Sequence, residues 1–177
     1  MKPPEQIEAE RLILRKPRVD DATAVFAGWV QDPDVTYFLT WRPHENIEMT
    51  KSVLEKTIAA WEQDFRFPFV IADKNTNQLV GMIEIRMEGH QAELGYVLAK
   101  VVWGKGYMTE AVQALINWAF QQPTIYRVYA TTSVDNAGSQ RVMEKAGMLR
   151  EGLLKKYIVH PNINDEPRDS YIYAIVK

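Results

Sequence analysis

The sequence has 177 residues, a mass of 20.4 kDa and a formal net charge of −2, with Lys and Arg scattered along the chain. Cysteine is absent, which excludes a disulfide framework, a thiolate zinc site and a cysteine nucleophile. The length suits a single catalytic domain over residues 1–177, and the scattered charge predicts no nucleic-acid partner.

Neither the N-terminal residues nor the most apolar segment indicates an exported protein or a membrane protein. The first ten residues, MKPPEQIEAE, carry two prolines and three acidic residues where a secretion signal needs a basic start and an apolar run. The most apolar window, 111–120, is interrupted by Gln113 and Asn117 and is too short to cross a bilayer. We therefore expect a cytoplasmic protein without a membrane segment.

The first part of the chain is predicted to run from a strand into two helices. Residues 11–15 (RLILR) read as a strand, and Asp20 or Asp21 can cap the helix that follows. Asn46 can cap a second helix that ends near Phe65. The core positions are Ala24, Val25 and Trp29 in the first helix and Leu54, Ile58 and Trp61 in the second.

A three-stranded antiparallel meander is expected next. Residues 67–72 and 79–87 read as strands joined by the turn 73–77, and Pro68 places the first strand near a sheet edge. Residues 92–98 form the third strand. A helix then ends before Pro123, and its apolar stripe is Met108, Val112, Leu115, Ile116 and Ala119.

The C-terminal part completes an α+β fold. It reads as a strand over 125–131, a short helix over 136–145 stopped by Gly147, and two strands near 152–159 and 170–176. Most neighbouring strands are expected to be antiparallel, in a mixed central sheet flanked by helices.

The most informative segment is the strand, glycine loop and helix of residues 93–110. Gly104 and Gly106 let the backbone approach a ligand, and the free amides of a helix start suit a phosphate or pyrophosphate. The donors would be the amides of Gly104, Lys105, Gly106, Tyr107, Met108 and Thr109. The alternative is a plain turn before a helix.

Two familiar phosphate motifs do not fit this loop. A Walker loop needs Ser or Thr after Gly-Lys, whereas Tyr107 and Met108 follow Gly106. A Rossmann fingerprint needs a third glycine where Thr109 stands, and a parallel βαβ unit around it. A nucleoside triphosphatase and a dinucleotide dehydrogenase are therefore disfavoured.

Four stretches together resemble the GNAT acetyltransferase superfamily, and within it the RimJ/RimL-like branch of ribosomal-protein N-terminal acetyltransferases. They are RLILR at 11–15, ELGYVL followed by WGKGYMTEA at 93–111, DNAGSQRVMEKAG at 135–147, and RDSY at 168–171. Their order covers nearly the whole chain. Val101 departs from the family pattern, which has Gln or Arg there.

The resemblance implies acetyl-coenzyme A (acetyl-CoA) as co-substrate and a sheet splayed at its site. The glycine-loop amides would hold the pyrophosphate, and the backbone of Val97, Leu98 and Ala99 would pair with the pantetheine arm. Asn136 would bind the pantetheine amides, and the hydroxyl of Ser139 would protonate the departing thiolate. The alternative is that both residues are only structural. Asn136 would then be the N-cap of the helix, and Ser139 would be a residue of its first turn without a function.

An acetylated amine must lose a proton, so a carboxylate or a water that it orders is needed. Glu93 is the best candidate, since it shares one strand face with Gly95 and Val97, and an exposed strand carboxylate is the alternative. Tyr96 alternates to the other face and is expected in the core. The hydroxyls considered as acids for the thiolate, besides Ser139, are those of Tyr107, Tyr157 and Tyr171.

The segment 36–44 is unusually rich in aromatic residues for a connection between two helices. The family resemblance implies that it forms one wall of the acceptor site. Tyr37 and Trp41 would contact the acceptor, or else anchor the loop to the core. The three histidines, His44, His90 and His160, lack metal-ligand spacing, so no metal is expected and all three are expected at the surface.

The sequence leaves three functions open. The first is acetyl transfer from acetyl-CoA to a primary amine, most plausibly a peptide or protein N-terminus. The second is transfer to a small amine such as a polyamine, an antibiotic or an amino acid. The third is a non-catalytic acyl-CoA sensor. A homodimer is compatible with each of them.

Overall fold

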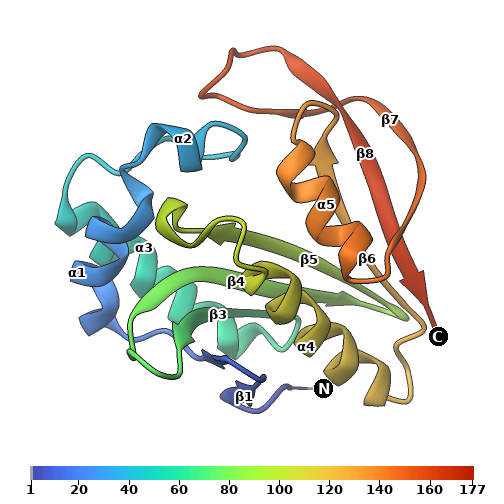
Figure 1. Ribbon diagram of the computed structural model, residues 1–177, viewed down its shortest axis with the longest axis horizontal. Helices are drawn as coiled ribbons and strands as arrows, with labels where there is room; N and C mark the ends of the chain where they lie inside the picture. Colours follow the sequence, from blue (N-terminus) through green and yellow to red (C-terminus); the bar gives the residue numbers. More distant parts are fainter. Residues whose placement is uncertain (1) are drawn as a thin grey trace.

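The computed structural model describes residues 2–177, and its centre is one eight-stranded sheet with the order β1-β2-β3-β4-β5-β6-β8-β7 (Figure 1). Adjacent strands are antiparallel except β5 and β6. The strands are β1 (Gln6–Glu8), β2 (Leu12–Arg15), β3 (Arg66–Asp73), β4 (Leu79–Glu88), β5 (Gln91–Leu98), β6 (Arg127–Ser133), β7 (Leu149–Val159) and β8 (Pro167–Val176). The predicted α+β fold with a mainly antiparallel sheet is confirmed.

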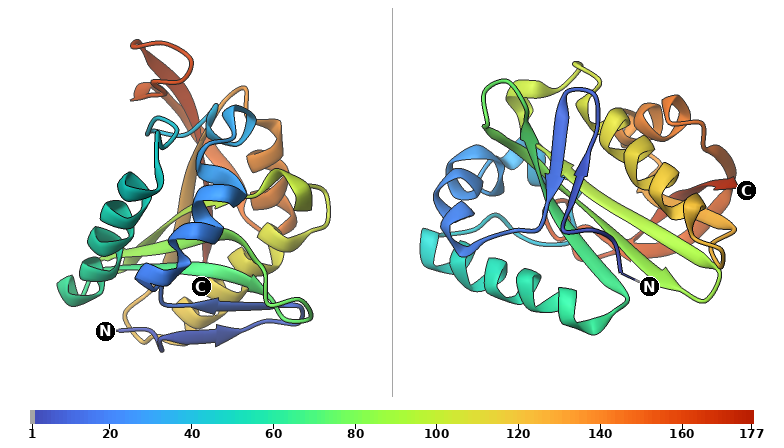
Figure 2. Two further views of the ribbon diagram at one scale, coloured as in Figure 1. Left: turned by 90° about the vertical axis from the view of Figure 1, so that its left-hand side faces the viewer. Right: turned by 90° about the horizontal axis from the view of Figure 1, so that it is seen from below.

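Helices cover both faces of this sheet. α1 and α3 lie on one face, and α4 and α5 lie on the other (Figure 2). The helices are α1 (Ala22–Val25), α2 (Pro33–Thr36), α3 (Ile47–Ala59), α4 (Tyr107–Gln121) and α5 (Ala137–Lys145). No helix within residues 2–177 is long and apolar enough to cross a membrane.

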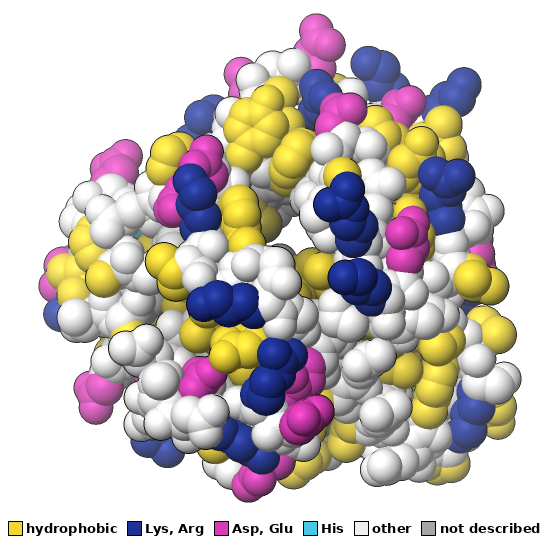
Figure 3. All heavy atoms as spheres, viewed as in Figure 1, with side chains coloured by type: hydrophobic (Ala, Val, Ile, Leu, Met, Phe, Trp, Pro, Cys, Tyr) yellow, Lys and Arg dark blue, Asp and Glu magenta, His cyan; other side chains and the backbone are white. Residues whose placement is uncertain are grey.

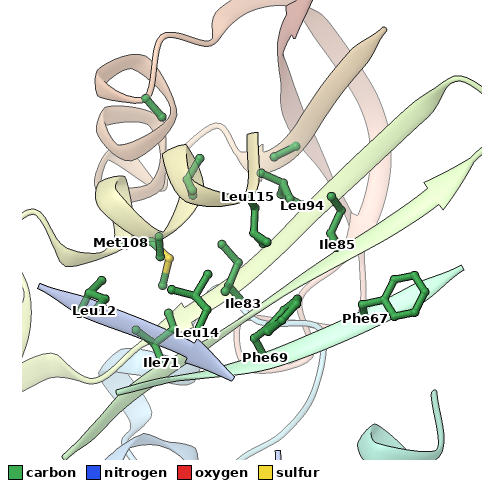
Figure 4. Packing of buried hydrophobic residues seen from close by; sticks show 14 of the residues in the cluster. Leu12, Leu14, Phe67, Phe69, Ile71, Ile83, Ile85, Leu94, Met108 and Leu115 are labelled. Atoms are coloured by element: carbon green, nitrogen blue, oxygen red, sulfur yellow. The ribbon is translucent and has the colours of Figure 1, made fainter. Parts of the chain in front are cut away.

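The main core lies between α4 and the sheet. The apolar stripe predicted for this helix is buried, and Met108 and Leu115 point from α4 toward the strands (Figure 4). The strand residues around them are Leu12, Leu14, Phe67, Phe69, Ile71, Ile83, Ile85 and Leu94. This packing fixes the start of α4, and with it the glycine loop, against the end of β5.

Several element boundaries differ from the prediction. β1 has three residues and α2 has four, so neither leaves a detectable periodicity in the sequence. The first predicted helix is a 3-10 turn, α1 and a π-turn over Phe26–Val30 in succession. β6 is shifted to Arg127–Ser133, and β7 begins earlier, at Leu149.

Pro68 was expected to place its strand near a sheet edge, but β3 is an internal strand. The backbone of Pro68 nevertheless lacks a partner strand on one side. β2 pairs only with residues 70–73 of β3, so the side of β3 facing β2 has no partner at Pro68. The strand is therefore a local edge at that residue.

The sheet splays between β5 and β6. These parallel strands pair only where Gln91–Glu93 meets Arg127–Tyr129, and they diverge beyond Glu93. The edge of β5 from Leu94 to Leu98 consequently has no strand partner on this side, and its backbone groups are available to an extended ligand, except that the Leu98 carbonyl accepts from Trp103 Nε1 at 2.8 Å. The splay implied by the family resemblance is confirmed.

Candidate active site

A cavity of about 900 Å³ occupies the splay and extends to α1, α3 and the segment 36–44. The space-filling view shows this face hollowed near its centre, with Lys and Arg side chains around the hollow (Figure 3). Of the residues expected to bind a substrate or to act as base or acid, those that line the cavity are Trp41, Glu93, Val97, Asn136, Ser139 and Tyr157. Leu98, Ala99, the glycine loop and Tyr37 are not among its lining residues.

The glycine loop has the geometry of an anion site next to this cavity. Gly104 and Gly106 have φ of 77° and 78°, a conformation that favours glycine. Gly106 is the N-cap of α4, and no side chain caps the helix, so its first amides are available. A Cβ at Gly104 would meet no protein atom within 4 Å, so the space in front of the loop is open. These features fit the pyrophosphate of a coenzyme.

The loop is held in place by Arg11 and Glu110, neither of which was selected as a site residue from the sequence. Arg11 Nη1 donates to the Lys105 carbonyl at 2.9 Å, and the Arg11 amide and Nε donate to the Glu110 carboxylate at 2.6 and 2.7 Å. Arg11 and Glu110 are 99 positions apart, and no local pattern in the sequence relates them. Their interaction connects β2 to the first turns of α4.

Tyr107 is also an anchor of the loop. Its hydroxyl donates to Asp73 Oδ2 at 2.6 Å, and this hydrogen bond lowers the pKa of Asp73 and raises that of Tyr107. The Tyr107 hydroxyl is thus occupied outside the cavity. Tyr171 packs under the guanidinium of Arg150, at 4.5 Å from its ring centroid, and does not line the cavity either. Of the three tyrosines considered as acids, Tyr157 is the one that lines it.

Asn136 and Ser139 lie at the start of α5, facing the splay. Asn136 Oδ1 accepts the Ser139 amide at 3.1 Å, so Asn136 is the N-cap of α5 and a cavity residue at once. Ser139 Oγ lies 2.8 Å from the hydroxyl of Tyr96, which also lines the cavity. Burial raises the pKa of Tyr96 to about 12, against a smaller opposing effect of its hydrogen bond with Ser139.

Tyr96 was expected in the core, and the structure confirms this for its ring but not for its hydroxyl. Its ring packs against the hydrophobic core, but its hydroxyl reaches Ser139 at the cavity wall. The alternation of β5 correctly separated Tyr96 from Glu93, whereas the position of α5 on the face of Tyr96 was not readable from the sequence.

Glu93 belongs to a network of ion pairs on the cavity face of β3, β4 and β5. Glu93 Oε2 accepts from Arg86 Nη1 at 2.9 Å, and Arg86 Nε donates to Glu84 Oε1 at 2.7 Å. Glu84 Oε2 also accepts from Arg66 Nε at 2.9 Å. All four residues line the cavity, and Glu84 is therefore a second carboxylate in it, one that no sequence motif indicated.

The aromatic segment 36–44 contributes to the cavity unevenly. Trp41 lines it, and its ring contacts that of His44 in a tilted arrangement, with 5.4 Å between centroids and 50° between planes. Tyr37 is 46% exposed and packs edge-on against Phe38. The expectation of acceptor contact thus has geometric support at Trp41 and none at Tyr37.

Two of the three histidines are buried, contrary to the expectation. His44 Nδ1 lies 2.8 Å from Thr50 Oγ1, and burial lowers the pKa of His44. His160 is 4% exposed at the end of β7, where it faces Phe38, and only His90 is at the surface. His44 contacts Trp41 and Thr50, and His160 contacts Phe38. Within residues 2–177, no three His, Asp or Glu side chains are grouped to hold a metal ion.

Comparison with known proteins identifies the family. The model of the acetyltransferase (GNAT) domain matches residues 11–149, and the chain belongs to this family. It is an acetyl-CoA-dependent N-acetyltransferase, and the resemblance found in the sequence is confirmed.

Individual relatives agree with that assignment. The chain is 31% identical to the uncharacterized N-acetyltransferase YnaD of Bacillus subtilis, over 97% of this chain and 96% of that protein. A GNAT-family acetyltransferase from Bacillus anthracis superposes with a TM-score of 0.84 at 35% identity, covering 97% and 98% of the two chains. The ribosomal-protein-S5-alanine acetyltransferase of Vibrio fischeri gives 0.80 at 25% identity, covering 97% and 96%.

Proposed function

We propose that the enzyme transfers the acetyl group directly to the α-amine of a peptide or protein N-terminus, with both substrates bound together. The Vibrio fischeri relative is named for such an acceptor, an alanine of a ribosomal protein. Cys is absent from the chain, so no cysteine acyl-enzyme can form. The cavity is large enough for an extended arm on the free edge of β5 and for an acceptor beside it.

The observation that carries the proposal is the distribution of polar groups about β5. Glu93 lies on one face of the strand, and the Tyr96–Ser139 pair lies on the other, with all three residues in the cavity wall. The nitrogen of the acceptor would attack the thioester carbon, Glu93 would accept the proton directly or through water, and the C–S bond would break. Ser139, hydrogen-bonded to Tyr96, would then return a proton to the thiolate.

The coenzyme would be held by backbone groups more than by side chains. The amides of Gly104 to Thr109 would receive the pyrophosphate. The backbone of Val97 to Ala99 would pair with the pantetheine arm through its remaining groups, since the Ala99 amide donates to the Val80 carbonyl and the Leu98 carbonyl accepts from Trp103 Nε1. Met108 would contribute its amide alone, because its side chain is in the core. The side chain of Asn136 reaches the same cavity.

An acceptor screen tests this function. Release of free thiol from acetyl-CoA would be followed with short peptides that begin with Ser, Ala, Thr or Met, and with amine-free buffer as the blank. Thiol release that depends on a peptide, with intersecting initial-rate lines, supports direct transfer to an N-terminus. Parallel lines, or acetylated protein isolated without an acceptor, would contradict the ternary complex. Acetyl-CoA binding without any amine-dependent release would indicate a sensor.

A further inference from the structure

The ion pair of Arg86 and Glu93 in the cavity wall leaves one polar atom free on each side chain. Glu93 accepts through Oε2, and within residues 2–177 its Oε1 makes no hydrogen bond. Arg86 donates through Nε and Nη1, and its Nη2 has no partner in the same part of the chain. Neither free atom is among the buried side-chain atoms that lack a hydrogen bond there. Both atoms are therefore open to a ligand.

The free nitrogen of Arg86 lies over β5, beside the proposed base. Arg86 and Glu93 both line the cavity, with 43% and 23% of their side chains exposed. A Cβ at Gly95 would lie 3.2 Å from Arg86 Nη2. Gly95 shares the cavity face of β5 with Glu93, so the guanidinium extends across the strand at a position where no side chain stands.

A free donor and a free acceptor thus lie next to each other. Arg86 is directly opposite Glu93 in the register of β4 and β5, and the bonded atoms Nη1 and Oε2 are 2.9 Å apart. Nη2 and Oε1 belong to the same two terminal groups. A carboxylate oxygen accepts from an amine, and a guanidinium nitrogen donates to a carbonyl or carboxylate oxygen. An amine and an oxygen on adjacent carbons of one molecule complement this pair.

The other charges of the wall do not favour a polycation. Glu84 is the other acidic residue of the lining, and it is bonded to both Arg66 and Arg86. The arginines of the lining are Arg42, Arg66 and Arg86, so the described wall carries one more positive than negative formal charge. A second ammonium group of the acceptor would meet arginines beside the pair.

We propose that Arg86 Nη2 binds a carbonyl or carboxylate oxygen on the carbon next to the acceptor amine, while Glu93 receives the amine. Arg86 is then a contact residue of the acceptor as well as the positioning residue of the base. The acceptors selected are α-amino compounds with that oxygen, such as peptide N-termini, over alkyl amines and polyamines. The inference rests on the proposed function and names the residue that distinguishes the acceptors.

The test compares two small acceptors, alaninamide, which carries the carbonyl group, and sec-butylamine, which lacks it. R86Q removes the guanidinium. R66Q is the matched control in the same wall, because it also removes a positive charge and a bond to Glu84 but leaves the Arg86–Glu93 pair. R18Q is the control at an exposed position outside the cavity. The ratio of variant to wild-type kcat/KM is measured for each acceptor, so the different pKa values of the two amines cancel.

R86Q should lower kcat/KM for both acceptors by a common factor, because Glu93 loses its partner. The value for alaninamide should fall by a further factor of roughly 10 to 100, since a charge-assisted hydrogen bond is lost as well. R66Q should change both values by the same factor, within about 2-fold. R86K keeps the charge without the fork, so it can bond Glu93 or the acceptor oxygen, and its loss should lie between wild type and R86Q.

G95A tests the position of the free nitrogen without removing a charge. Gly95 has no positive φ, so alanine fits the backbone, but its methyl group would stand 3.2 Å from Arg86 Nη2 and displace the guanidinium. Alaninamide should lose more kcat/KM than sec-butylamine in this variant too. Equal effects on the two acceptors would contradict the proposed position of the oxygen.

Equal losses for both acceptors in R86Q would overturn the contact, and so would an equal discrimination by R66Q. Wild-type activity with alaninamide and none with sec-butylamine would support it if R86Q then lost the alaninamide activity and R66Q retained it. Thermal stabilisation by acetyl-CoA shows in each variant whether the fold and the coenzyme site are intact. If thiol release by the wild type did not depend on any amine, the proposed function itself would fail, which is distinct from transfer without discrimination.

Discussion

Arg86 Nη1 donates to Glu93 Oε2 at 2.9 Å, and the same guanidinium bonds Glu84 through Nε at 2.7 Å. One arginine therefore holds two carboxylates on the face of the sheet that lines the cavity. Its fixed fork restrains both side chains, so either carboxylate is presented to the cavity in a defined position. Any assignment of the base must consequently test Glu84 beside Glu93.

The glycine loop gives the first prediction. Coenzyme A at 100 times its Kd should stabilise the wild type by about 2.7 kcal/mol, and Gly106→Val should abolish this shift because the side chain blocks the approach of the ligand. The left-handed backbone itself costs on the order of 1–2 kcal/mol for a non-glycine residue. Gly89→Val is the matched control, since Gly89 also has a positive φ, of 59°, but lies in the β4–β5 turn.

Thermal unfolding with and without coenzyme A measures both effects. Gly89→Val should lose comparable stability and retain the full ligand-induced shift. If saturating coenzyme A still stabilised Gly106→Val as it does the wild type, the glycine loop would not be part of the coenzyme site.

The second prediction concerns the anchor of this loop. Arg11→Ala removes the hydrogen bonds to Lys105 and Glu110, so the loop should lose its fixed position without losing its glycines. We expect KM for acetyl-CoA to rise roughly 5- to 20-fold, with kcat at saturation within about 3-fold of wild type. Arg18→Ala, at an exposed position near the same strand, serves as the control in steady-state kinetics. A fall in kcat alone would assign Arg11 a different role.

The elements that local signals specify could be predicted from the sequence. The cap at Asn46, the apolar stripe of α4 and the stop at Gly147 each depend on residues within a few positions, and each is present in the structure. The glycine loop and the N-cap at Asn136 were found for the same reason. Glu93 was selected because strand alternation placed it on one face with Gly95 and Val97, ahead of the glycine loop, and it lines the cavity.

Long-range pairs account for what the sequence did not show. The Arg11–Glu110 anchor, the contact of Asn162 with the segment 36–44 and the burial of His160 join residues up to 126 positions apart. Such contacts follow from strand order, and the crossing that places β8 between β6 and β7 has no local signature. An isolated histidine therefore read as a surface residue although tertiary packing buries it.

The third prediction uses the raised pKa of Tyr96. Because burial raises its pKa from 10.0 to about 12, the folded protein keeps this proton in a range where the unfolded chain releases it. The stability associated with Tyr96 is complete below pH 10 and should decrease by up to about 3 kcal/mol as pH rises to 12. Tyr96→Phe should remove that part of the decrease in denaturant unfolding measured from pH 9 to 12.

The same variant probes catalysis. Tyr96→Phe keeps the ring in the core and removes the partner of Ser139, so turnover should fall while coenzyme stabilisation remains. A pH dependence of stability identical to that of the wild type would mean that Tyr96 does not titrate abnormally. Unchanged turnover in both Tyr96→Phe and Ser139→Ala would exclude the pair as the proton donor to the thiolate.

The last prediction tests Glu93 as the base. A peptide α-amine has a pKa of roughly 7.7–8.0, so near neutrality most of the acceptor is protonated and a base contributes on the order of 10²–10⁴-fold. Glu93→Gln should therefore lose most activity near pH 7, retain stabilisation by coenzyme A, and recover partly as pH rises past the pKa of the amine. For a lysine-like amine, with a pKa of about 10.4, the recovery should be delayed to more alkaline solution.

The control and the competing carboxylate make this result decisive. Glu88→Gln, at the exposed end of β4, should behave as the wild type at every pH. Glu84→Gln should have a smaller effect than Glu93→Gln if Glu93 accepts the proton, since Glu84 bonds two arginines and Glu93 only one. A Glu93→Gln variant with wild-type rates throughout, beside a Glu84→Gln variant that loses activity at neutral pH and regains it in alkali, would move the role of base to Glu84.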